Sequence, residues 1–127
     1  LMFHWSIQPD LLEHNVVTFC LQPLIENAIQ HGLRAKRGQG NIYIGAERLA
    51  DSSICLSVSD DGVGMEEKQL QEQNNSLELS YQTVKQHVGL SNVNQRIKIL
   101  FGDQYGIQLF RREGGGLTVK ISLPAHE

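Results

Sequence analysis

The stretch LQPLIENAIQHG, residues 21–32, decides the fold of this chain. Its apolar residues recur at helical spacing and predict a helix from about Thr18 to His31. The expected buried stripe consists of Leu21, Leu24, Ile25, Ala28 and Ile29. Asn27 and His31 are four residues apart, so they are expected to stack along one edge, with Glu26 on the opposite flank. On this stretch alone, a core helix with an ordinary solvated flank remains an equal alternative.

The segments around this helix alternate between apolar and polar residues, which is typical of half-buried strands. The predicted strands cover residues 3–7, 41–49, 53–59, 107–109 and 117–123. The first is expected to bury Phe3, Trp5 and Ile7 on one side. A second helix is predicted from Val88 to Phe101, with Gly102 as its stop. Its expected buried stripe is Leu90, Val93, Ile97, Leu100 and Phe101.

Residues 66–87 are rich in Gln and Asn, hold few apolar residues and show no lasting periodicity. A polar segment of this length inside a compact domain is usually functional or mobile. We expect at most a short helix near residues 66–73. Another loop, residues 34–40, holds Arg34, Lys36 and Arg37 and is either a solvated turn or an approach to an anion.

The order strand, helix, two strands, polar loop, helix, two strands predicts a two-layer α/β sandwich. Its sheet is expected to be mixed but mostly antiparallel, with about five strands and both helices on one face. The 127 residues suit a single domain over 1–127. Because the chain opens directly on a strand pattern without an initiator Met, we expect a fragment of a longer protein.

The composition narrows the classes of partner. A net charge of −3 argues against a general nucleic-acid or membrane surface. No run of residues is long enough for a membrane span or a signal peptide. Cys20 and Cys55 lack metal-ligand spacing and are expected to be two reduced thiols.

The stretch DDGVGM, residues 60–65, follows a predicted strand directly. A carboxylate at the end of a strand can accept a hydrogen bond from an amino group of a bound base, and Gly62 and Gly64 allow close approach of the backbone. A calcium loop is disfavoured, because the following residues do not supply oxygen ligands at regular spacing with a closing Glu. A simple turn remains an equal alternative for this stretch in isolation.

Gly89 stands at the start of the second helix, where free backbone N–H groups and the helix dipole favour a phosphate. One glycine is a weak signal by itself. The stretch matches neither the GxxxxGK[ST] pattern of a phosphate-binding loop nor the GxGxxG pattern of a dinucleotide fold.

Taken together, these stretches and the turn at Gly114–Gly116 resemble, in their order, the ATP-binding domain of the GHKL superfamily, which includes gyrase, Hsp90, histidine kinases and MutL. The stretches LQPLIENAIQHG and VGLSNVNQRIKILFG are similar to the LytS/YesM-like sensor histidine kinases of bacterial two-component systems. The resemblance covers nearly the whole chain. It implies the Bergerat fold, a two-layer α/β sandwich, with residues 66–87 as a flexible ATP lid.

The resemblance implies roles for residues of the first helix. Asn27 matches the asparagine that coordinates Mg²⁺ bridging the phosphates of ATP. Glu26 matches the catalytic carboxylate that polarises the attacking nucleophile, and His31 lies where a residue near the phosphates is expected.

The resemblance also implies a pocket for the base. Asp60 matches the aspartate that recognises the adenine amino group, and Gly62, Gly64 and Met65 belong to the adenine-binding stretch. Gly89 and Leu90 match the glycine motif close to the phosphates. Asn92 and Arg96 are further candidates to face them.

Three departures from the family pattern bear on nucleotide affinity. Pro23 stands where many histidine kinases carry a second asparagine, and His87 replaces one glycine of the phosphate motif. The threonine often found after the last glycine turn is Leu117 here, and Thr118 follows one place later. Because successive strand residues face opposite sides, this shift argues against an adenine contact from Thr118.

The implied activity is Mg-ATP binding and transfer of the γ-phosphoryl group to a histidine on an upstream dimerisation domain. The implied partners are that domain and a response regulator, in a homodimer whose cytoplasmic catalytic part is anchored to the cell membrane by upstream segments. None of the chain's own histidines lies in a dimerising helix pattern. The alternatives are a nucleotide-gated binding module without transfer and an ATPase of the gyrase or Hsp90 kind.

Overall fold

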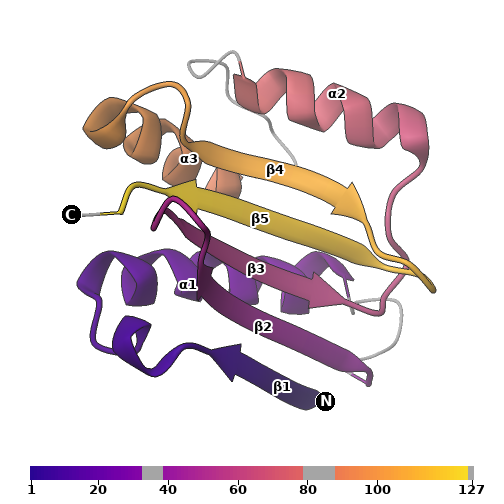
Figure 1. The fold of residues 1–127 in the computed structure, drawn as a ribbon. Coiled ribbons are helices and arrows are strands. Elements are labelled where there is room, and N and C mark those ends of the chain that lie inside the picture. Colours follow the sequence, from indigo (N-terminus) through magenta and orange to yellow (C-terminus); the bar gives the residue numbers. More distant parts are fainter. Residues whose placement is uncertain (33–38, 79–87, 126–127) are drawn as a thin grey trace.

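A computed structural model describes residues 1–32, 39–78 and 88–125. Five strands form one mixed sheet in the order β1-β2-β3-β5-β4 (Figure 1). The strands are β1 (Met2–Ile7), β2 (Asn41–Arg48), β3 (Ile54–Asp60), β4 (Gly106–Arg111) and β5 (Leu117–Leu123). β1 runs parallel to β2, and the other three pairings are antiparallel. The predicted mixed, mostly antiparallel sheet is confirmed.

Two helices, α1 (Asn15–Asn27) and α3 (Val88–Phe101), lie on one face of the sheet, and α2 (Glu67–Glu78) packs along the β4 side (Figure 1). The strands alternate as their sequences predict, with every second residue buried under the helices and the next one partly exposed on the other face. The core therefore lies between the sheet and the helices, and the predicted two-layer arrangement is confirmed. The opposite face of the sheet is polar and open.

The first helix begins earlier than predicted. α1 starts at Asn15, and the Nδ1 atom of His14 accepts a hydrogen bond from the backbone N–H of Val17 at 3.4 Å. Pro9–Leu11 form a short 3-10 turn before it. Residues 15–17, which precede the predicted start at Thr18, are therefore helical, and a nitrogen of His14 serves as the N-terminal cap.

The last turn of this helix is π-helical over Ala28–Gly32. The backbone hydrogen bonds of a π turn join residues five apart rather than four, so the regular α-helix ends at Asn27 rather than at the predicted His31. Ile29 is 38% exposed, which corrects its place in the buried stripe. The side chain of His31 lies outside the described residues, as do residues 33–38 with their basic side chains.

Three further burial predictions are wrong. Phe3 is 40% and Trp5 is 60% exposed, because β1 is an edge strand that α1 does not cover completely. Leu100 is 70% exposed, because it lies roughly 80° around the helix from Leu90. Asn94 occupies the buried position instead, with 1% exposure.

Two asparagines attach the helices to the backbone of edge strand β4. Asn74 of α2 donates to the carbonyl of Leu109 and accepts from its N–H at 3.0 and 2.8 Å. Asn94 of α3 accepts from the N–H of Ile107 at 2.8 Å and donates to the carbonyl of Leu77 at 2.7 Å. These bonds account for α2 extending to Glu78, beyond the short helix predicted at 66–73. The remaining part of the predicted lid, residues 79–87, lies outside the described residues.

Candidate functional site

The carboxylate of Asp60 lies at the end of β3, on the helix side of the sheet, and is 3% exposed. Its Oδ1 atom accepts the backbone N–H of Gly62 at 2.9 Å, and the backbone N–H of Leu117 also bonds to the side chain. Burial raises the pKa of Asp60 above its ordinary value, and these two N–H donors oppose that rise. The result is a buried carboxylate in a fixed orientation.

Glycines bring two backbone segments together beside Asp60. Gly116 has φ +104°, and a Cβ on it would lie 2.8 Å from the carbonyl carbon of Asp60. Gly64 has φ +70°, and a Cβ on it would lie 2.9 Å from the carbonyl oxygen of Gly116. The turn at Gly114–Gly116 is thus part of the Asp60 site. The sequence identified both glycine stretches, but their contact is visible only in the structure.

The carboxylate of the next residue, Asp61, has different hydrogen-bond partners. Asp61 accepts the backbone N–H and the side-chain N–H of Asn41, each at 2.8 Å. The side-chain oxygen of Asn41 in turn lies 2.8 Å from Nε2 of His4. Asp61 therefore joins the end of β3 to the start of β2, whereas Asp60 faces the helix layer.

On α1, Glu26 and Asn27 differ sharply in exposure. Asn27 is 9% exposed at the last α-helical position, where α1 and the π turn both pack against β3. Glu26 is exposed, and its Oε1 atom lies 3.4 Å from Nε2 of Gln22. A hollow of about 190 Å³ between α1 and α3 brings Glu26 together with Asn92 and Arg96. The hollow thus gathers the carboxylate of Glu26 and the guanidinium of Arg96 with the amides of Gln22 and Asn92, and Asn27 is not among the residues that line it.

The remaining predicted site residues contribute mainly backbone or packing. Leu90 is 1% exposed, so its side chain belongs to the core and only its backbone is available to a ligand. Gly89 lies in the first turn of α3, as expected for a helix N-terminus. Met65 is partly buried against the core. His87 lies outside the described residues.

Thr118 faces away from Asp60. Its hydroxyl oxygen lies 2.7 Å from that of Ser59 on the open side of the sheet. Leu117, whose N–H bonds to Asp60, is instead 6% exposed on the helix side. The one-residue shift seen in the sequence therefore places the hydroxyl on the wrong face for an adenine contact.

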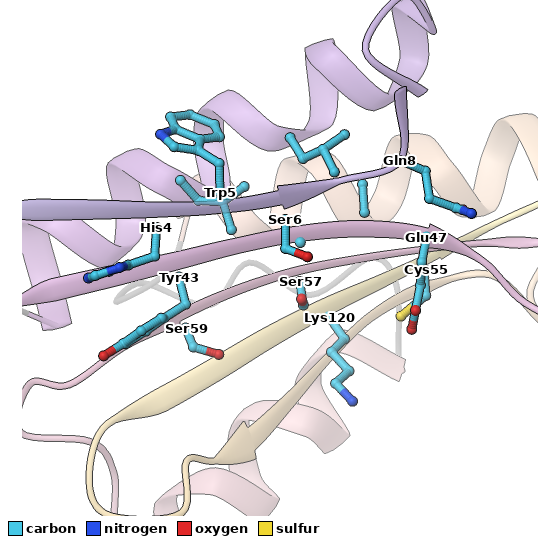
Figure 2. Close-up of a pocket in the computed structure, with 14 residues that line it drawn as sticks. His4, Trp5, Ser6, Gln8, Tyr43, Glu47, Cys55, Ser57, Ser59 and Lys120 are labelled. Atoms are coloured by element: carbon cyan, nitrogen blue, oxygen red, sulfur yellow. The ribbon is translucent and has the colours of Figure 1, made fainter. Parts of the chain in front are cut away.

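A hollow of about 710 Å³ lies on this open face rather than at Asp60. Figure 2 shows His4, Tyr43, Ser57, Ser59 and Lys120 pointing into it from the strands. The rings of His4 and Tyr43 stack at 4.7 Å, and the guanidinium of Arg112 lies 4.7 Å from the centre of the Tyr43 ring. None of the residues predicted to bind nucleotide lines this hollow.

Within the part of the chain that the structure describes, no helix combines the length and apolar character needed to cross a membrane. Residues 1–32, 39–78 and 88–125 also contain no group of three or more His, Cys, Asp or Glu side chains placed to hold a metal ion. Mg²⁺ does not require such a cluster, because it usually keeps several waters and takes further ligands from phosphates.

The chain is similar in sequence to a known protein family and to several of its members. The family model for histidine kinase-, DNA gyrase B-, and HSP90-like ATPases matches residues 15–127. The chain is 30% identical over 124 residues to the sensor histidine kinase YesM of Bacillus subtilis, covering 98% of this chain and 20% of YesM. It is 31% identical over 121 residues to the sensor protein kinase HptS of Staphylococcus aureus, covering 95% of this chain and 23% of HptS. The chain thus spans about a fifth of the length of these relatives.

Solved structures show the same fold. The nucleotide-free catalytic domain of histidine kinase ThkA superimposes with a TM-score of 0.71 at 22% identity, covering 98% of this chain and 80% of that domain. ThkA in complex with the response regulator protein TrrA superimposes with a TM-score of 0.63 at 20% identity, covering 98% of this chain and 34% of that one.

Proposed function

The chain belongs to the family of histidine kinase-, DNA gyrase B-, and HSP90-like ATPases, and from that premise we propose that residues 1–127 form the catalytic, ATP-binding domain of a sensor histidine kinase. The buried carboxylate of Asp60 is the observation that carries this proposal most directly. Two backbone N–H groups fix its orientation, and Gly64 and Gly116 allow the two backbone segments beside it to pack closely. A fixed acceptor of this kind recognises the amino group of adenine.

The phosphate side of the proposed site is formed by α1 and α3. Asn27 supplies the amide oxygen for Mg²⁺, which neutralises charge on the phosphates when it is bound. The first turn of α3, with Gly89 and Leu90, offers backbone N–H groups to the same anion. His31 is the further phosphate-side residue in this proposal, and Met65 joins Gly62 and Gly64 on the base side.

Glu26 is the proposed catalytic residue, because its carboxylate is exposed next to Asn27. It accepts the N–H of the incoming imidazole, so that the other ring nitrogen presents its lone pair. That nitrogen forms the N–P bond as the bond between the γ-phosphorus and the bridging oxygen breaks. ADP leaves with the electron pair, and the imidazole proton passes to the carboxylate or to water.

The proposal also covers the full-length protein. The acceptor histidine lies on a dimerisation domain, the product phosphohistidine serves a response regulator, and the intact kinase is a homodimer anchored in the membrane with this domain in the cytoplasm. The likeness to ThkA, which is seen in complex with the response regulator protein TrrA, supports the response regulator as a partner.

Calorimetric titration with ATP tests the proposal. Asp60→Asn should lower affinity about 10- to 150-fold, since a hydrogen bond to a charged group contributes about 1.5–3 kcal/mol. Asn27→Ala should weaken binding mainly when Mg²⁺ is present. Ser57→Ala, on the opposite face of the sheet, is the matched control and should bind as the parent does. Equal binding of GTP and ATP by the parent would remove the adenine assignment.

Transfer is tested in the full-length kinase with γ-labelled ATP. The label should be acid-labile, as phosphohistidine is, and Glu26→Gln should slow its appearance while ATP affinity stays unchanged. Acid-stable label would indicate Ser or Thr chemistry and refute the histidine-kinase assignment. ATP binding with no label at all would favour the nucleotide-gated module.

A further inference from the structure

Arg112 directly follows β4 and reaches across the open face of the sheet. Its guanidinium lies 4.7 Å from the centre of the Tyr43 ring on β2, a strand that pairs with neither β4 nor β5. The same guanidinium donates through Nη1 to the carbonyl of Gly115 at 3.1 Å. Arg112 is half-buried, whereas the side chain of Arg111 beside it is 60% exposed. One side chain thus joins the glycine turn to a distant strand of the sheet.

The backbone of Arg112 is part of the same turn. Its N–H bonds to the carbonyl of Gly116 at 3.1 Å, and its carbonyl accepts the N–H of Gly115 at 3.0 Å. Gly116 is the residue whose backbone packs against the carbonyl of Asp60. A planar guanidinium can stack on a ring and donate hydrogen bonds from its edge at the same time, which a compact ammonium cannot do. A displacement of Arg112 therefore displaces the backbone that packs against Asp60.

A second series of contacts connects the Tyr43 ring to the residue after Asp60. Tyr43 stacks on His4, its partner in register on β1, with ring centres 4.7 Å apart (Figure 2). Nε2 of His4 lies 2.8 Å from Oδ1 of Asn41. Asn41 donates its backbone and side-chain N–H groups to Asp61, each at 2.8 Å. Contacts that start from one aromatic ring therefore lead to both backbone segments that meet at Asp60.

We propose that Arg112 is a positioning residue for base recognition and that Tyr43 holds its guanidinium in place. This inference rests on the proposed kinase function and adds to it residues on the face of the sheet opposite the nucleotide. Neither side chain touches the base in this proposal, because both act through the Gly116 backbone beside Asp60. Burial raises the pKa of Asp60, and the positive charge of Arg112 is among the groups that oppose this rise, whereas Asp61 adds to it.

The test measures how strongly the full-length kinase distinguishes ATP from purine riboside triphosphate, which lacks the exocyclic amino group of adenine. The ratio of the two dissociation constants isolates the hydrogen bond to Asp60, because the sugar and the phosphates are the same. Arg112→Gln should reduce this ratio roughly 3- to 10-fold, since the carboxylate loses its fixed orientation. Arg111→Gln is the matched control, because it removes the same charge from an exposed position next to it. It should leave the ratio within about twofold of the parent.

Conservative variants separate geometry from charge and from stability. Arg112→Lys keeps the positive charge but not the planar group, so it should lower the ratio as Arg112→Gln does. Tyr43→Phe keeps the ring and should match the parent, whereas Tyr43→Leu should lower the ratio. All ratios are measured below the melting temperature of every variant, where a purely structural role would leave them unchanged.

An unchanged ratio in Arg112→Gln would overturn the positioning role while leaving the kinase function intact. Full recovery of the ratio in Arg112→Lys would also overturn it, because charge alone would then be sufficient. Equal ratios in Tyr43→Leu and Tyr43→Phe would overturn the part assigned to the ring. A parent that binds both triphosphates equally well would overturn the adenine assignment of Asp60 itself, and this role with it.

Discussion

Replacing Gly116 by Ala should damage both the fold and the nucleotide site, whereas the same change at Gly115 should damage only the fold, and less. The two glycines have similar backbone strain, with φ +104° and +111°. Their surroundings differ, since a Cβ on Gly116 would meet the carbonyl of Asp60 and a Cβ on Gly115 meets nothing within 4 Å. Gly115→Ala is therefore a matched control for the contact with Asp60.

The magnitude follows from these two terms. A side chain forced into this backbone region costs about 1–3 kcal/mol, and this is the whole expected effect of Gly115→Ala. Gly116→Ala adds a steric term of about 1–3 kcal/mol for overpacking, which gives a total of roughly 2–6 kcal/mol. Relief of the clash moves the start of β5 away from Asp60, so the Leu117 N–H loses its alignment with the carboxylate.

Urea unfolding without nucleotide measures the stability terms, and calorimetry measures the ATP affinity. Gly116→Ala should weaken ATP binding by at least about tenfold, or 1.4 kcal/mol, whereas Gly115→Ala should leave it within about twofold. Equal stability losses together with equal ATP affinities in the two variants would refute the claim that the glycine turn shapes the Asp60 site.

Two stability predictions and one reactivity prediction follow from other buried groups. Asn94→Ala should lower the free energy of unfolding by about 1–3 kcal/mol for each backbone group that loses its hydrogen bond, the N–H of Ile107 and the carbonyl of Leu77. Asn92→Ala, at an exposed position of the same helix, should change it by less than about 0.5 kcal/mol in urea titrations. Because burial raises the pKa of Asp60 above 3.8, the native state holds that proton more tightly than the unfolded state. The free energy of unfolding should therefore fall as the pH rises from 3.8 through the raised pKa of Asp60. Asp60→Asn should remove this pH dependence. Burial raises the pKa of the Cys20 thiol to about 11, so iodoacetamide at pH 8 should label it only after unfolding, as mass spectrometry would show.

The sequence determined most of the strands and helices, and it indicated Asp60 as the candidate residue on the base side. Alternation of period two gives the strands, and the spacing of Leu21 and Leu24 gives the first helix, because both patterns are local. The position of Asp60 after a run of strand residues also predicted a carboxylate at the end of that strand. Cys20 and Cys55 are free, as their spacing indicated.

Tertiary structure alone decided which predicted surfaces are covered. Trp5 and Leu100 have the character of core residues but stay exposed, because burial depends on which element packs opposite, and periodicity carries no information about that neighbour. Asn94 is polar yet buried, because the edge of β4 needs hydrogen-bond partners, and the helix packed beside it supplies one. The contact of Gly116 with Asp60 joins segments more than fifty residues apart, so chain folding, rather than either motif, creates the site.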